Sequence, residues 1–155
     1  LAWSRFKLAI PYVGRLYQKL YLARISDNLN TMLSSGISMV RSLEITSDVV
    51  GNQVYKNILI EASEAIKSGS AMSDIFTRYR EVPGVMVQMI KVGEESGKLG
   101  FVLDKLSKFY EREVGNEVET LVGLIEPALI VTLGVGVGIL LTSVLVPIYN
   151  LAQGF

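Results

Sequence analysis

Glu94 and Glu95 are the residues whose type and spacing come closest to a catalytic pair. Two carboxylates can serve as general acid and general base when both reach the same reacting group. Adjacent residues on a helix point in different directions, however, so this pair is poorly arranged for such a role. The sequence has no histidine and no cysteine, which excludes histidine bases, cysteine nucleophiles and the usual zinc sites within this chain. Chemistry based on carboxylates alone, on lysine or on a Ser-Lys pair survives in principle, but we predict no catalytic, metal-binding or cofactor-binding residue.

Charged residues occupy only part of the chain. The last basic residue is Arg112, the last acidic residue is Glu126, and the stretch from Pro127 to Phe155 is uncharged. The 15 basic and 15 acidic residues give a net charge of zero, so bulk electrostatics give no support for binding nucleic acid. The chain thus consists of a polar part followed by an apolar part.

The apolar part predicts one transmembrane helix, with a span from about Pro127 to Pro147. A helix rises about 1.5 Å per residue, so roughly 20 apolar residues cross a hydrocarbon core about 30 Å thick. A buried core helix is the alternative, but a domain of this size has little means of surrounding a helix that is apolar on every side. Basic residues near the span lie only on its N-terminal side, which predicts that the polar part faces the cytoplasm.

Two features of this span concern its packing. Glu126 and Pro127 stand at its edge, where a carboxylate is costly unless it reaches headgroups or a partner. Glu126 is therefore either an interfacial residue that reaches water or a packing or relay position inside an oligomer. Gly134 and Gly138 have the Gly-x-x-x-Gly spacing that lets helices approach closely. We predict membrane lipid and further copies of the chain as partners.

Before the span, apolar residues recur at helical rather than strand spacing, and glycine and proline separate the repeats. The predicted fold is all-α: an antiparallel bundle of about six helices followed by the C-terminal transmembrane helix. Helix starts are expected at Ser38 and Asn52 as N-caps, and at Ser70 or Ser73 for a short fourth helix. The six predicted helices cover 13–35, 38–50, 52–69, 70–79, 83–97 and a longest one from 98 onward, which Gly115 interrupts.

The predicted helices divide the chain into four parts. Residues 1–12, with basic and aromatic residues interleaved, indicate a juxtamembrane segment, although an ordinary amphipathic first helix fits them as well. The bundle takes residues 13–117. A long helix over 118–149 continues into the membrane, and 150–155 form a short extracytoplasmic tail.

The stretch PGVMVQMIKVGEESGKLGFVLDKLSKFYEREV, residues 83–114, resembles the signature region of the type II secretion system F family. Other pieces agree in order, from IPYVGRLYQKLYLAR and LNTMLSSGISMVRSLEI through IKSGSAMSDIF to LIEPALIV and LVPIYN. The resemblance covers nearly the whole chain. The chain is similar to the second of two cytoplasmic helical domains of that family, together with its last transmembrane helix.

The resemblance implies a non-enzymatic platform protein in the bacterial inner membrane, multi-pass in its full length. Such a platform couples a cytoplasmic hexameric assembly ATPase to the assembly of pilins or pseudopilins in type IV pilus biogenesis or type II secretion. The implied partners are the ATPase, these subunits and other inner-membrane assembly proteins.

The family motif falls on six residues of this sequence, which are Pro83, Gly93, Glu94, Ser96, Gly97 and Leu99. We expect Gly97 to follow a helix end with positive φ and Gly93 to permit close helix approach. Glu94 and Ser96 can hydrogen-bond around the turn. These residues form either a tight helix–helix corner or a surface for a partner.

Three alternatives remain open from the sequence. The first is a tail-anchored helical adaptor or receptor domain unrelated to pilus machinery. The second is a tail-anchored hydrolase that uses Glu94 and Glu95, and the third is membership of the archaeal-type relatives of the platform family.

Overall fold

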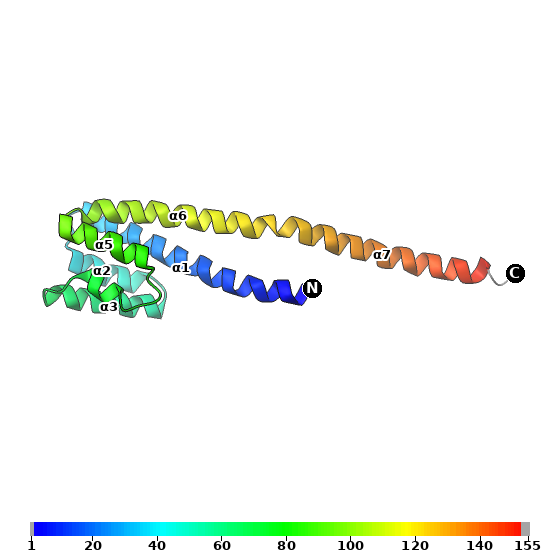
Figure 1. Cartoon of the computed structure of the whole chain (residues 1–155), viewed down its shortest axis with the longest axis horizontal. Coiled ribbons are helices and arrows are strands. Elements are labelled where there is room, and N and C mark those ends of the chain that lie inside the picture. Colours follow the sequence, from blue (N-terminus) through cyan, green and yellow to red (C-terminus); the bar gives the residue numbers. More distant parts are fainter. Residues whose placement is uncertain (1, 153–155) are drawn as a thin grey trace. The chain divides into compact units, whose positions relative to one another are not determined.

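The computed structural model describes the backbone of residues 2–152 and the side chains of residues 14–149 (Figure 1). Every regular element in this part of the chain is a helix, which confirms the all-α prediction of about six bundle helices followed by an apolar one. Two compact units are present, residues 1–115 and 116–155. The helices are α1 (Ala2–Ser34), α2 (Met39–Val49), α3 (Gln53–Lys67), α4 (Met72–Phe76), α5 (Gly84–Ser96), α6 (Leu99–Gly123) and α7 (Ile125–Ala152).

The first helix begins much earlier than predicted. The periodicity indicated a start at Val13, but α1 extends back to Ala2. Pro11 lies within this stretch. The side chains of the predicted juxtamembrane segment, residues 1–12, and of the predicted tail, residues 150–155, lie outside the described residues.

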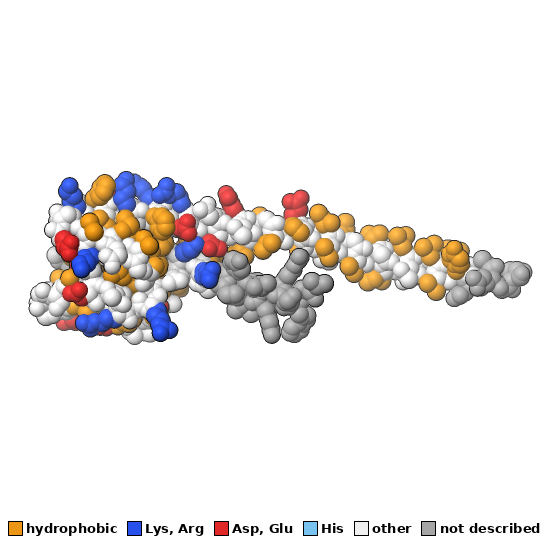
Figure 2. All heavy atoms as spheres, viewed as in Figure 1, with side chains coloured by type: hydrophobic (Ala, Val, Ile, Leu, Met, Phe, Trp, Pro, Cys, Tyr) orange, Lys and Arg blue, Asp and Glu red, His pale blue; other side chains and the backbone are white. Residues whose placement is uncertain are grey.

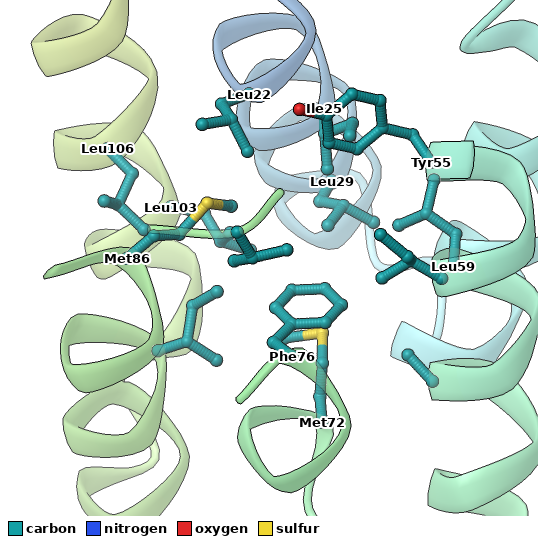
Figure 3. Packing of buried hydrophobic residues seen from close by; sticks show 14 of the residues in the cluster. Leu22, Ile25, Leu29, Tyr55, Leu59, Met72, Phe76, Met86, Leu103 and Leu106 are labelled. Carbon is teal, nitrogen blue, oxygen red and sulfur yellow. The ribbon is translucent and has the colours of Figure 1, made fainter. Parts of the chain in front are cut away.

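The bundle is held by one apolar core. Successive helices from α1 to α5 pack on one another, and Figure 3 shows side chains from α1, α3, α4, α5 and α6 pointing toward a common centre. Burying each large aliphatic side chain contributes roughly 1.5–3 kcal/mol relative to leaving it exposed. The largest fully buried apolar side chains are Leu22, Leu29, Leu43, Ile58, Leu59, Met72, Phe76, Met86, Ile90, Leu103 and Leu106.

Helix starts follow the predicted caps in two of three cases. The Ser38 hydroxyl accepts from the Arg41 N–H at 3.4 Å, and the Asn52 side chain accepts from the Val54 N–H at 2.9 Å. The prediction for the fourth helix was wrong, because neither Ser70 nor Ser73 caps it. Ala71 occupies the N-cap position of α4 and makes no side-chain cap hydrogen bond.

The sixth helix also differs from its prediction. It has 25 residues and is shorter than α1, with 33, and α7, with 28. It continues through Gly115 and ends at Gly123. The helical ladder breaks at Leu124, whose N–H bonds the Leu121 carbonyl at 3.2 Å. Proline accounts for this position, because Pro127 has no N–H to donate to the Gly123 carbonyl four residues earlier.

An ion pair joins the two longest helices of the bundle. Lys19 Nζ of α1 lies 2.8 Å from Glu113 Oε2 of α6, and both side chains are partly buried. These residues are 94 positions apart, so the pair closes the bundle between its first and last helices.

Candidate functional site

The family motif lies at the corner where α5 turns into α6. Gly97 has φ +67°, as predicted, and two hydrogen bonds close the end of α5 around it. The Lys98 N–H donates to the Gly93 carbonyl at 2.9 Å, and the Gly97 N–H donates to the Glu94 carbonyl at 3.4 Å. This pair of bonds is the Schellman motif, which satisfies carbonyls left free at a helix end.

Gly93 allows α6 to pack directly on α5. It is buried, and a Cβ placed on it would lie 3.1 Å from both the Leu99 Cα and the Val102 Cγ2. This distance is tighter than nine in ten real Cβ contacts, so a side chain here would require Leu99 or Val102 to shift by a few tenths of an ångström. Leu99 itself packs against the buried core. The expectation that Gly93 permits a close approach is confirmed by this geometry.

Glu94 bonds to a different helix from the one expected. Its Oε1 accepts from the Met72 N–H at 2.7 Å, and its Oε2 accepts from the Ser73 N–H at 3.3 Å. It does not bond around its own turn. Glu94 instead supplies, from α5, the cap that Ala71 cannot give to α4. A carboxylate is favourable here because the N–H groups and the dipole at a helix start attract negative charge.

The remaining motif residues have local roles. The Ser96 hydroxyl donates to the Val92 carbonyl at 2.7 Å, one turn back along α5, so this bond does lie at the turn as predicted. Pro83 is the N-cap of α5, with φ −61° and ψ 144°, where its missing N–H breaks no helical bond. Together, the motif is a tight corner that fixes α4, α5 and the start of α6.

A surface hollow lies beside this corner. Residues from the C-terminal part of α1 and from the start of α6 line it, and Phe101 on its rim is 62% exposed. Its lining combines small, apolar and polar groups. Among the described residues no cluster of acidic side chains could hold a metal ion. The hollow is lined by Asn30, Leu33, Ser34, Gly97, Leu99, Gly100, Phe101 and Asp104.

The unit 116–155 contains a helix that is long and apolar enough to cross a membrane. Its most apolar 18-residue window has a mean hydropathy of 2.5, and none of that window is buried (Figure 2). The two threonines of α7 satisfy their hydroxyls on their own helix, because Thr132 donates to the Ala128 carbonyl at 2.7 Å and Thr142 to Gly138 at 2.8 Å. The helix therefore presents few unmet polar groups to lipid.

The predicted packing residues of this helix are all exposed within one chain. Glu126 lies in the first turn of α7, followed by Pro127. A Cβ added at Gly134 or at Gly138 would meet nothing within 4 Å. A shallow hollow runs along the face of Gly138, Thr142 and Val146. The glycine face is thus open to another helix.

Sequence reasoning found the corner but missed Glu94's partners and the hollow. The missing signal was present in SGSAMSDIF, where an alanine precedes the fourth helix. An N-cap without an acceptor implies that the acceptor comes from elsewhere in the fold. The hollow depends on α1 meeting α6, which no local pattern specifies.

Comparison with known proteins gives consistent matches. A family model described as type II secretion system (T2SS), protein F, matches residues 25–147. The chain is 36% identical to the type IV pilus assembly protein PilC of Thermus thermophilus. This match extends over 149 residues, which are 96% of this chain and 37% of the relative. It is 33% identical to PilC of Myxococcus xanthus, over 97% of this chain and 36% of the relative. It is 29% identical to the type II secretion system protein F of Pseudomonas aeruginosa, over 97% of this chain and 37% of the relative. The chain therefore spans little more than a third of the length of these relatives.

Proposed function

Because the chain belongs to the type II secretion system protein F family, we propose that it is part of a membrane platform for type IV pilus assembly or type II secretion. The observation that carries this proposal is the family match over residues 25–147, which includes most of the bundle and the apolar helix. The platform couples a cytoplasmic hexameric assembly ATPase to the assembly of pilins or pseudopilins. Other inner-membrane assembly proteins and further copies of the chain complete it.

The connection between α6 and α7 supports this coupling role. α6 begins at the motif corner, at Leu99, and ends at Gly123, and only Leu124 separates it from α7. Along the chain, Leu124 is therefore the one residue outside a helix between Leu99 and the apolar segment. The chain needs no catalytic chemistry for such a role.

The family match favours this function over the alternatives. The relatives of this chain are named as pilus assembly and secretion proteins. These names do not fit a tail-anchored adaptor unrelated to pilus machinery. A hydrolase that uses Glu94 is disfavoured as well, because both oxygens of that carboxylate are engaged by backbone N–H groups of α4. We infer that Glu94 has a structural rather than an acid–base role.

Membrane orientation follows from the charge pattern under this proposal. The family and the apolar helix support a place in the bacterial inner membrane. The bundle lies in the cytoplasm, because the basic residues of this sequence precede the apolar segment. A periplasm-active reporter fused after Phe155 should be active, and the same reporter inserted at Gly69 should be silent. The reverse pattern would overturn the orientation.

Gene deletion in the source organism tests the function itself. The deletion strain should lose either surface pili or the export of a secreted substrate, and the full-length gene should restore the lost activity. The two readouts also separate pilus assembly from secretion. A deletion strain that assembles pili and secretes normally would overturn the proposed function.

A further inference from the structure

The outward face of α6 carries a row of cations and aromatic rings. At about 100° per residue, these side chains fall within roughly 100° of the helix circumference. We call this row the basic–aromatic stripe. Its members are Lys98, directly before α6, and Phe101, Lys105, Lys108, Phe109 and Arg112 within the helix.

The stripe is not part of the core. The side of α6 that packs inward carries Leu103 and Leu106, both fully buried. Phe101 is 62% exposed and Phe109 is 41% exposed. Figure 2 shows basic side chains with hydrophobic ones among them along the edge that α6 occupies in Figure 1. Large exposed rings in a row are costly to leave in water and are typical of contact surfaces.

The charge of the stripe is largely uncompensated. Lys108 pairs with Asp104 at 3.0 Å, at the edge of the stripe. Lys98, Lys105 and Arg112 make no ion pair within the part of the chain that the structure describes. Lys105 Nζ lies 5.2 Å from the centre of the Phe101 ring, a cation–π contact that holds both groups at the surface.

We propose that the basic–aromatic stripe is a docking surface for an acidic protein partner. Carboxylates on the partner would meet the three unpaired cations, and its apolar side chains would cover Phe101 and Phe109. The seven-residue spacing of Lys98, Lys105 and Arg112 matches two turns of a partner helix. The proposal rests on the proposed function, which supplies a cytoplasmic partner, the assembly ATPase.

An anionic membrane surface fits the stripe less well than a protein does. Arg112 is the last basic residue before the apolar segment, and Pro127 follows it 15 positions later in the sequence. This interval contains Glu113, Glu117, Glu119 and Glu126 and no basic residue. Glu113 is paired with Lys19, but anionic headgroups would repel Glu119 and Glu126, whereas a protein partner placed on the stripe need not approach them.

The test measures binding of the purified assembly ATPase of the same organism to the full-length protein in phosphatidylcholine nanodiscs. The double reversal K105E/R112E should weaken binding by about tenfold or more, and Phe101→Ala by about threefold or more. Affinity of the parent should fall as salt rises from about 0.05 to 0.3 M.

The matched control is R24E/R80E, which reverses two exposed arginines off the stripe and should change affinity less than about twofold. Melting temperatures of all variants should match the parent, since every changed side chain is exposed.

Three outcomes would overturn the docking surface. In the first, the stripe variants bind the ATPase as the parent does. In the second, the reversal lowers binding only to vesicles that contain phosphatidylglycerol, which would make the stripe a lipid surface. In the third, the parent does not bind the ATPase. The proposed function is tested separately by gene deletion, and it fails if the deletion strain assembles pili and secretes normally. It survives if the full-length gene restores the lost activity while the stripe variants bind the ATPase as the parent does.

Discussion

Glu94 is the residue of the motif whose role the structure defines most closely. Its carboxylate caps α4 through the Met72 and Ser73 N–H groups, and α4 has only five residues. Glu94→Ala leaves both donors without a side-chain partner and should lower the free energy of unfolding by about 1–2 kcal/mol. Glu94→Gln keeps one acceptor oxygen and should cost less. Chemical denaturation of the bundle measures both.

Glu95 provides the control for that prediction. It is adjacent in sequence and exposed, so Glu95→Gln should change stability by less than about 0.5 kcal/mol. Equal stability of Glu94→Ala and Glu95→Gln would show that the cap contributes nothing. A platform that loses assembly activity with Glu94→Gln while its stability is unchanged would indicate a partner role for this carboxylate.

Gly97 is the second residue at this corner with a measurable requirement. A β-branched residue is strained at φ +67°, so Gly97→Val should destabilise the bundle by about 1–2 kcal/mol. Gly100→Val is the matched control, because Gly100 lies in a helix and a Cβ added there would meet nothing within 4 Å. Thermal melting compares the two, and a Gly97→Val protein that melts like the control would refute the backbone account.

Residue roles were predictable from sequence where the partner is close in the chain. The caps at Ser38 and Asn52 and the turn at Gly97 depend on neighbours within about five residues, so the local pattern specifies them. Glu94 bonds to residues 21 and 22 positions away. No local pattern identifies such a partner, and the prediction placed the bond at the wrong helix end.

Two buried tyrosines give the bundle a defined response to alkaline pH. Burial raises the pKa of Tyr55, and likewise the pKa of Tyr110, from 10.0 to about 12. Because the folded state holds these protons more tightly, their stabilising effect is complete below pH 10.0 and is lost between pH 10.0 and about pH 12. The bundle should therefore lose stability in that window. Tyr110→Phe should reduce the loss, and Tyr17→Phe, at a residue 53% exposed, should not.

The end of α6 determines where the bundle can be separated from the apolar helix. The compact unit ends at residue 115, and Glu113 pairs with Lys19 at 2.8 Å. A chain that ends at Gly115 should be soluble, helical and cooperative in melting. Ending at Arg112 removes Glu113 and should cost about 0.5–1 kcal/mol more. Circular dichroism and gel filtration measure both, and an aggregated 1–115 chain would mean that α7 completes the core.

Elements were predicted well where glycine or a cap marks an end, and poorly where nothing does. The bounds of α2, α3 and α5 lie within about two residues of their predicted ones, a normal uncertainty for helix ends. The start of α1 has no such marker. The break in the last long helix was placed at Gly115, yet it occurs at Leu124, because a proline three residues later removes a donor that a glycine keeps.

At the scale of the whole molecule, the apolar helix α7 is an exposed surface. Up to Tyr149, where the described side chains end, its residues make no part of the core, so a soluble bundle would leave a large apolar area in water. Lipid and neighbouring helices are the environments that remove this cost. Because α7 is apolar on all sides, its composition does not distinguish a face that contacts lipid from a face that contacts another helix.

Gly138 and Glu126 separate the two roles that α7 could have. In lipid, helix association depends on close backbone approach, and a leucine at Gly138 blocks the face shared with Gly134. We expect Gly138→Leu to lower crosslinking between full-length copies in membranes by about threefold or more. Gly136→Leu, nearly opposite on the helix, is the matched control and should have a smaller effect.

Glu126→Gln should leave crosslinking unchanged, because Glu126 is exposed in the first turn of α7 and a neutral amide is cheaper beside hydrocarbon. A loss with Glu126→Gln would place that carboxylate in a helix–helix contact, and unchanged crosslinking in all three variants would leave α7 as an anchor alone.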